Sequence, residues 1–173
     1  MEFAAYADGV FAWEGRRTRC ALGPAGVIAA DRKREGDGAT PGGVWPIRRV
    51  LYRADRRPPP QTALAVSMIS PSDGWCDDPA DLAYNLPVRW PYHASAERLW
   101  REDGLYDLLA PLGFNDDPVR PGRGSAIFLH LAKPGFAPTE GCVALASEDL
   151  EAVLAAARPG DALRVLECGA PAI

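Results

Sequence analysis

The sequence has little of what metal and redox sites require. It contains only two histidines and four cysteines in 173 residues, and no two cysteines form a Cys-x-x-Cys pair. This pattern excludes zinc ribbons and thioredoxin-type redox motifs. We therefore expect no metal site and no organic cofactor. Disulfides are possible but not required in a chain of this length.

Long apolar runs and an excess of positive charge are also missing. No stretch is long and apolar enough for a transmembrane helix, and the first residues lack the basic start and apolar segment of a secretory signal. The formal net charge is −4, and acidic residues surround the local basic clusters. We therefore expect neither a membrane span nor a nucleic-acid partner.

Glycine and proline, in contrast, are abundant. Seventeen of each divide the chain into short elements, which favours a turn-rich, mostly β protein over a helical bundle. Hydrophobic residues make up 47% of the chain, enough for one core at this length. No linker or internal repeat is visible, so we predict a single domain over residues 1–173.

The expected elements are short strands with one clear helix. Residues 125–131 form a strongly β-prone run. Ser147 is expected to cap a helix through residue 157, with acidic residues in the first turn where the helix dipole favours them. A second, short helix is expected over residues 96–101, after an N-cap at Ser95.

One histidine and one cysteine lie close together in the sequence. His130 ends an apolar run, and Cys142 follows twelve positions later (142 − 130) in a Thr-x-Gly-Cys turn. A cysteine can act as a covalent nucleophile, a histidine can take its proton, and Gly141 allows close approach to an acyl oxygen. The N–H groups of Gly141 and Cys142 could also form an oxyanion hole. The pattern favours cysteine acyl-transfer chemistry.

Each of these residues also has a structural interpretation. A free cysteine is usually a small buried hydrophobe, and a single strand histidine is more often a packed core or edge residue, so spacing alone leaves both readings open. A zinc site from Cys142, His130 and another cysteine is disfavoured because no pair has the spacing of metal ligands. His93 has no reactive neighbour in the sequence and is interpreted as structural.

Two motifs together resemble the L,D-transpeptidase catalytic domain (YkuD-type) family. Gly124-Ser-Ala-Ile-Phe-Leu-His130 followed by Thr139-Glu-Gly-Cys-Val-Ala-Leu145 is similar to that family's signature of a histidine, a spacer and Ser/Thr-His-Gly-Cys. The loop Lys33-Arg-Glu-Gly-Asp-Gly-Ala-Thr-Pro-Gly-Gly43 resembles its Gly-Asp-Gly-x-Thr-Pro-x-Gly stretch. The resemblance covers almost the whole chain.

The resemblance implies a fold and a reaction. The fold would be mostly β, a mixed-sheet sandwich or barrel with a helix after the catalytic cysteine. Cys142 would attack a diaminopimelate carbonyl in a peptidoglycan stem, with His130 as base and then acid, and the thioester would pass to a neighbouring stem. The resulting cross-link, which would serve cell-wall organisation and cell shape, would join two diaminopimelates or L-Ala to diaminopimelate.

Two other functions stay open. Release of the thioester to water would make the protein an L,D-carboxypeptidase or endopeptidase, and a chain without catalysis would be a peptidoglycan-binding module. The resemblance further implies donor and acceptor stem peptides as partners, carbapenem-type β-lactams as covalent inhibitors, and a place in the periplasm or cell envelope.

The signature departs from the family at Glu140, which stands where the family has a histidine and indicates a divergent branch. Glu140 is expected to bind the ammonium group of the acceptor, with a solvated surface acid as the alternative, and Thr139 to orient the turn or contact substrate. The remaining expected substrate-binding residues come from the glycine-rich loop and from a long loop that would roof the cleft, although turn formation and loop packing are alternatives: Lys33, Asp37, Thr40, Trp75, Tyr84 and Asn85.

Overall fold

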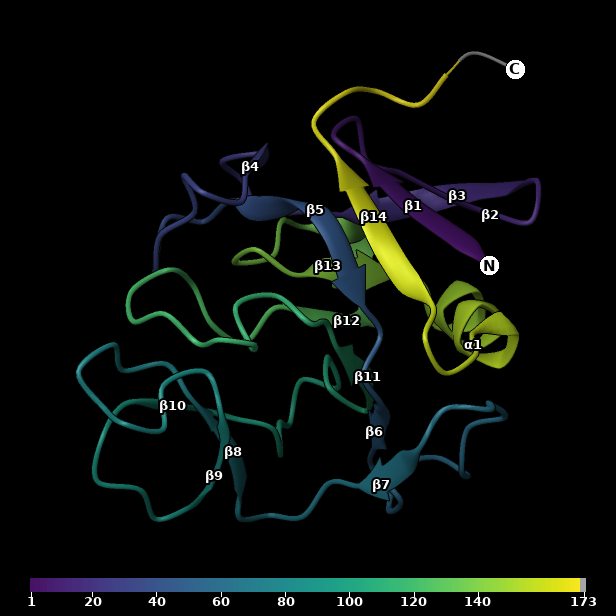
Figure 1. Ribbon diagram of the computed structural model, residues 1–173. Coiled ribbons are helices and arrows are strands. Elements are labelled where there is room, and N and C mark those ends of the chain that lie inside the picture. Colours follow the sequence, from purple (N-terminus) through teal and green to yellow (C-terminus); the bar gives the residue numbers. More distant parts are fainter. Residues whose placement is uncertain (172–173) are drawn as a thin grey trace.

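The computed structural model describes residues 1–171 as one large mixed β-sheet, a small second sheet and one α-helix (Figure 1). The mostly β mixed-sheet fold expected from the sequence is therefore confirmed. In the large sheet the strand order is β4-β5-β14-β1-β2-β3-β13-β12-β11-β6-β7, and in the small sheet it is β10-β8-β9. The strands are β1 Glu2–Tyr6, β2 Val10–Trp13, β3 Arg16–Ala21, β4 Val27–Ala29, β5 Thr40–Pro46, β6 Val50–Tyr52, β7 Val66–Met68, β8 Asp73–Cys76, β9 Pro87–Arg89, β10 Ala96–Arg98, β11 Leu108–Pro111, β12 Phe128–Leu131, β13 Val143–Leu145 and β14 Ala162–Leu166.

Strands β12 and β13 lie side by side in the middle of the large sheet. They are parallel, with Leu129 opposite Val143 and His130 opposite Ala144. Strand β11 flanks β12 and strand β3 flanks β13, both antiparallel. Because side chains alternate along a strand, His130 and Phe128 share one face of β12 and Leu129 faces the other.

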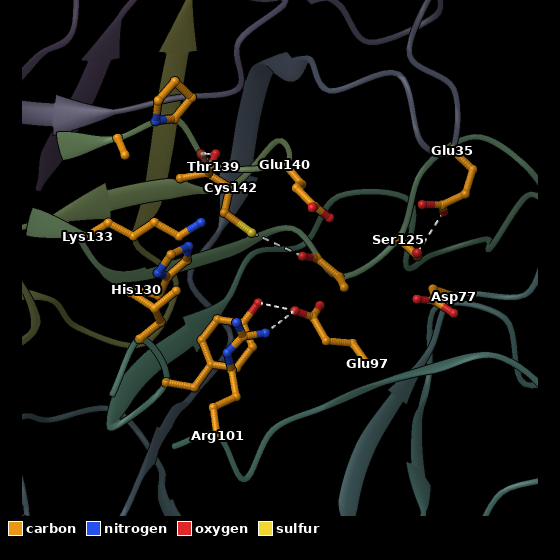
Figure 2. Close-up of a pocket in the computed structure, with 15 residues that line it drawn as sticks. Glu35, Asp77, Glu97, Arg101, Ser125, His130, Lys133, Thr139, Glu140 and Cys142 are labelled. Carbon is orange, nitrogen blue, oxygen red and sulfur yellow. Dashed lines mark hydrogen bonds and ion pairs between the residues drawn. The ribbon is translucent and has the colours of Figure 1, made fainter. Parts of the chain in front are cut away.

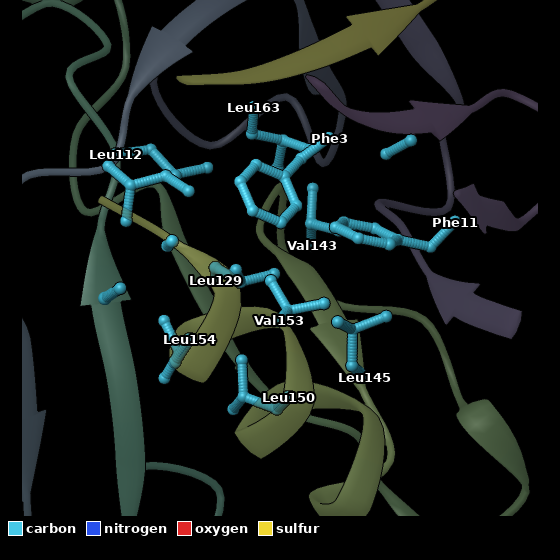
Figure 3. Packing of buried hydrophobic residues seen from close by; sticks show 14 of the residues in the cluster. Phe3, Phe11, Leu112, Leu129, Val143, Leu145, Leu150, Val153, Leu154 and Leu163 are labelled. Carbon is cyan, nitrogen blue, oxygen red and sulfur yellow. The ribbon is translucent and has the colours of Figure 1, made fainter. Parts of the chain in front are cut away.

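The two faces of these strands are buried against different cores. On one face, Leu129 and Val143 pack with residues of the helix, including Leu150 and Val153 (Figure 3). On the other face, Phe128 lies in a second cluster, whose buried members also include Leu51, Ile69, Trp75, Leu99, Leu105, Tyr106, Leu109, Ala126 and Cys142. Burying one such large apolar side chain contributes about 1.5–3 kcal/mol, so both faces hold β12 and β13 in place.

Helix α1 spans Ser147–Ala156 and follows β13 directly, as predicted. Its N-cap is Ala146 rather than Ser147, and Glu148 and Asp149 occupy the first turn. A short 3-10 helix, η1, covers Pro134–Phe136 between β12 and β13.

The predicted helix over residues 96–101 is wrong. Residues Ala96–Arg98 form strand β10, which pairs antiparallel with β8 so that Glu97 lies opposite Trp75. The ladder extends through a bond from the Asp77 N–H to the Ser95 carbonyl at 3.2 Å. Pairing with a strand twenty residues away in sequence therefore outweighs the local capping signal.

The described part of the chain was also examined for disulfides, clusters of metal ligands and membrane-spanning helices. The four cysteines are free thiols, and residues 1–171 contain no group of three metal-ligating side chains. Within the same range, no helix has the length and apolar character needed to cross a membrane.

Candidate active site

The predicted pair Cys142 and His130 faces a single cavity of about 150 Å³ beside β12 and β13 (Figure 2). His130 projects from β12, and Cys142 immediately precedes β13, level with Phe128 in the register of the two strands. The small sheet contributes the opposite wall through Glu97 of β10. The complete lining consists of Glu35, Asp77, Glu97, Arg101, Leu105, Tyr106, Ser125, Ala126, His130, Lys133, Ala137, Pro138, Thr139, Glu140 and Cys142.

The thiol of Cys142 is buried and held by two backbone groups. Sγ receives a hydrogen bond from the Phe128 N–H at 3.3 Å and donates one to the Ala126 carbonyl at 3.2 Å. Burial is the main cause that raises the pKa of the Cys142 thiol to about 12, with smaller contributions from the carboxylates of Glu97 and Glu140. At neutral pH the resting nucleophile is therefore a thiol and not a thiolate.

The imidazole of His130 is neutral and has a defined tautomer. Its Nδ1 lies 2.8 Å from the Leu131 carbonyl oxygen; a carbonyl can only accept, so the proton sits on Nδ1 and Nε2 is left as an acceptor. The ring packs edge to face on Tyr106, with centroids 5.3 Å apart. Burial lowers the pKa of His130 to about 4, with smaller contributions from Arg101 and Lys133. A neutral imidazole is the form that a general base requires.

The turn before Cys142 is closed by Thr139. Its hydroxyl donates to the Cys142 carbonyl at 2.7 Å and receives the Gly141 N–H at 3.1 Å. Gly141 has a φ of 129°, and a Cβ there would lie 2.8 Å from the Ala39 carbonyl oxygen. Gly141 is thus needed for close packing, and its N–H is engaged within the turn. The expectation that Gly141 donates to an oxyanion is not met in this conformation, and the Cys142 N–H is the remaining donor of the predicted two.

The glycine-rich loop contributes Glu35 to the cavity wall, whereas Lys33, Asp37 and Thr40 lie outside the lining. The Lys33 ammonium is buried and contacts the Asp37 carboxylate at 2.5 Å. Asp37 also accepts the Ala39 N–H at 2.9 Å, and the buried Thr40 hydroxyl accepts the Gly23 N–H at 2.9 Å. These contacts are internal to the loop, which agrees with a part in building the site; a role in binding substrate stays a prediction.

The expected lid residues are also internal. Trp75, Tyr84 and Asn85 are buried and absent from the cavity wall. The Asn85 Oδ1 accepts the Trp75 Nε1–H at 2.9 Å and the Ala126 N–H at 3.0 Å, while its Nδ2 donates to the Phe114 carbonyl at 3.1 Å. These hydrogen bonds hold the segment before β12 in place. A roof over the cavity would need side chains on the solvent side, whereas these three are buried.

Five charged lining residues were not anticipated from the sequence: Glu35, Asp77, Glu97, Arg101 and Lys133. The Glu97 carboxylate accepts the Tyr106 hydroxyl at 2.5 Å and lies 3.4 Å from an Arg101 nitrogen, and burial raises the pKa of Glu97. Apart from Glu97 and Arg101, which lie four positions apart, these residues come from separate segments, and each resembles an ordinary surface charge in the sequence. Lys133, which follows β12, completes the set of charges.

A comparison with protein families shows which family the chain belongs to. The family model described as YkuD, the L,D-transpeptidase catalytic domain, matches residues 3–165, a range that includes both His130 and Cys142. No curated protein matches the sequence. With nearly the whole chain covered by the model, the protein belongs to the YkuD family of L,D-transpeptidase catalytic domains.

Proposed function

We propose that residues 1–173 form one catalytic domain, a peptidoglycan L,D-transpeptidase with Cys142 as nucleophile and His130 as general base. The observation that carries the proposal is the shared cavity: a cysteine and a neutral histidine, placed by adjacent parallel strands, face the same space. Family membership supplies the substrate class, peptide stems of the cell wall.

In the first half-reaction the stem is cleaved and the enzyme is acylated. His130 Nε2 takes the thiol proton as Sγ attacks the carbonyl carbon at the L-centre of diaminopimelate. The Cys142 N–H donates to the developing oxyanion. The carbon–nitrogen bond to D-Ala then breaks, His130 returns the proton to the departing nitrogen, and a thioester remains on Cys142.

In the second half-reaction an amine of another stem replaces D-Ala. The amine nitrogen attacks the thioester carbonyl, His130 takes a proton from that nitrogen, and the carbon–sulfur bond breaks as the proton returns to sulfur. The product is an amide cross-link and a free thiol. Attack by water along the same path would give a carboxypeptidase or endopeptidase.

Burial determines how the nucleophile is activated. With the thiol pKa raised and the imidazole pKa lowered, both groups are neutral at rest, so an ion pair of thiolate and imidazolium is not stored in the free enzyme. The proton moves only when Sγ turns from the Ala126 carbonyl toward His130. Activation is thus coupled to arrival of the carbonyl carbon.

The turn residues have different proposed roles. Thr139 orients the turn through its two hydrogen bonds. Glu140 is an exposed member of the cavity wall without a basic partner among residues 1–171, and we assign it to attraction of the acceptor's ammonium group.

The proposed action on stem peptides implies a location in the cell envelope. It also makes carbapenem-type β-lactams suitable acylating inhibitors of Cys142.

Purified protein with disaccharide-tetrapeptides as substrate tests this function. The wild type is compared with Cys142→Ala, His130→Gln and a matched control, Cys168→Ala, since Cys168 is an exposed thiol far from the cavity. We expect cross-linked dimers by mass spectrometry from the wild type and Cys168→Ala only. Tripeptide without dimers would show hydrolysis, and absence of any Cys142-dependent product would reject the proposal.

A further inference from the structure

The two ends of the cavity carry opposite charge. Figure 2 shows Lys133 and Arg101 beside His130, whereas Glu35 and Asp77 lie at the opposite end, beyond Cys142. Lys133 and Arg101 lower the pKa of His130, which agrees with a cationic end beside this ring. A scissile bond placed between Cys142 and His130 would therefore have a cationic wall on one side and an anionic wall on the other.

The anionic end is held in place without being neutralised. The Glu35 carboxylate accepts hydrogen bonds from the hydroxyls of Tyr84 and of Ser125, the latter at 2.7 Å. Tyr84 is itself fixed by the Gly124 N–H at 2.9 Å. Among the ion pairs of residues 1–171, none involves Glu35 or Asp77. Both carboxylates line the same cavity, and neither has an ion-pair partner among the described residues to offset its charge.

Asp77 adds a separate observation. Its Oδ1 is a buried oxygen with no hydrogen-bond partner among the described residues, and leaving a buried polar atom unpaired costs about 1–3 kcal/mol. The carboxylate lines the cavity, where a donor on a bound ligand would satisfy it.

The cationic end has one free charge. Arg101 is already engaged by Asp103 at 2.6 Å and approached by Glu97 at 3.4 Å. Lys133 forms no ion pair within residues 1–171 and is exposed at the cavity wall. The Lys133 ammonium is therefore available to a negative group on the amine side of the scissile bond, next to the base that must protonate the leaving nitrogen.

We propose that Asp77 with Glu35, and Lys133 at the other end, are specificity-determining residues that read opposite charges on the two sides of the scissile amide. The residue on the carbonyl side carries an ammonium toward Asp77 and Glu35, and the residue on the amine side carries a carboxylate toward Lys133. The inference rests on the proposed function. The two charged ends determine the direction in which the donor stem lies in the cavity. The terminal carboxylate of D-Ala is then one of the groups that the enzyme recognises.

The anionic end has a further consequence for the donor. A carboxylate on the carbon that bears the ammonium, as at the free end of diaminopimelate, is repelled by Asp77 and Glu35. Donors whose third residue has a net positive side chain, such as lysine or diaminopimelate amidated at that carboxyl, should therefore exceed unmodified diaminopimelate in kcat/KM.

Release of the C-terminal residue from three synthetic tetrapeptides tests the assignment. The peptides carry L-lysine, Nε-acetyl-L-lysine, or L-lysine followed by D-alaninamide in place of D-Ala. Wild-type kcat/KM should fall about tenfold on acetylation and about tenfold on amidation, the loss of one charge-assisted contact in each case.

Variants separate the two ends. In Asp77→Asn the preference for free over acetylated lysine should shrink to about twofold, while the preference for the C-terminal carboxylate persists. In Lys133→Gln the preference for the C-terminal carboxylate should shrink to about twofold, while the preference for free lysine persists. Asp31→Asn and Arg16→Gln alter exposed charges outside the cavity and should keep both preferences. Equal wild-type rates on all three peptides, or full preferences in both variants, would overturn the assignment while the transpeptidase proposal stands. Failure of every peptide to give Cys142-dependent release would remove the proposed function and the assignment together.

Discussion

The Cys142 thiol donates a hydrogen bond to the Ala126 carbonyl oxygen, 3.2 Å from Sγ. Ala126 has a φ of 52°, an uncommon conformation for a residue with a Cβ, and its N–H is held by Asn85. The acceptor of the resting thiol is thus fixed by a buried side chain from a distant loop, and the nucleophile is kept protonated and directed away from solvent.

This arrangement predicts slow alkylation of Cys142. With the pKa of Cys142 raised to about 12, the thiolate fraction at pH 7 is far below that of an ordinary thiol, so iodoacetamide should modify the exposed Cys168 at least tenfold faster. Peptide mapping by mass spectrometry at pH 6–10 measures both sites in one molecule. Faster modification of Cys142 than of Cys168 at pH 6–7 would show that the thiol is ionised at rest.

His130 should make the folded state less stable in acid. Its pKa is lowered from about 6.5 to about 4 in the folded protein, so the unfolded chain binds the proton first as pH falls. The stabilisation is complete above pH 6.5 and is lost toward pH 4, up to about 3 kcal/mol. Urea unfolding of wild type and His130→Gln across this range tests it. Identical pH dependence in the two proteins would contradict the prediction.

Asn85→Ala should destabilise the fold strongly. The variant leaves the Trp75 Nε1–H and the Ala126 N–H without their acceptor in a buried environment, which costs about 2–4 kcal/mol. Asn115→Ala is the matched control, because Asn115 also bonds to backbone groups and has positive φ but is only half-buried. Urea midpoints that fall equally in both variants would argue against a special role for Asn85.

Gly141→Ala should cost both stability and activity. The new Cβ would lie 2.8 Å from the Ala39 carbonyl, and it would also add strain at a φ of 129°. Gly122→Ala has positive φ as well, at 73°, but open space around the position. We expect a loss of about 1 kcal/mol for Gly122→Ala and at least about 3 kcal/mol for Gly141→Ala. Equal thermal midpoints of Gly141→Ala and Gly122→Ala would show that the turn accommodates the new Cβ without loss of stability.

The sequence was informative where local pattern and final structure coincide. The β-prone run before His130 became β12, and the capped helix after Cys142 became α1, since both follow from short-range periodicity. The same logic failed at residues 96–101, where strand pairing with β8 decides the conformation. A single-residue cap signal carries too little free energy to resist a ladder of backbone hydrogen bonds.

The candidate site, like the fold, could be predicted from the sequence only in part. Cys142 and His130 could be paired from a spacing of twelve residues, but Asp77 and Glu97 reach the cavity only through contacts between separate loops and sheets. Asn85 could be singled out from the sequence, but whether it roofs the cleft or packs within a loop could not be decided there; it is buried and absent from the cavity wall. Sequence pattern indicates which residues are unusual, whereas packing decides whether they face substrate or hold the residues that do.

The central place of β12 and β13 in the eleven-stranded sheet has a consequence for motion. Local fraying starts at edges, here β4 and β7, and cannot reach strands that are paired on both sides and covered on both faces. Amide hydrogens of Leu129 and Ala144 should exchange with solvent deuterium only when the whole sheet opens. The strands that position Cys142 and His130 should therefore separate only when the whole domain unfolds.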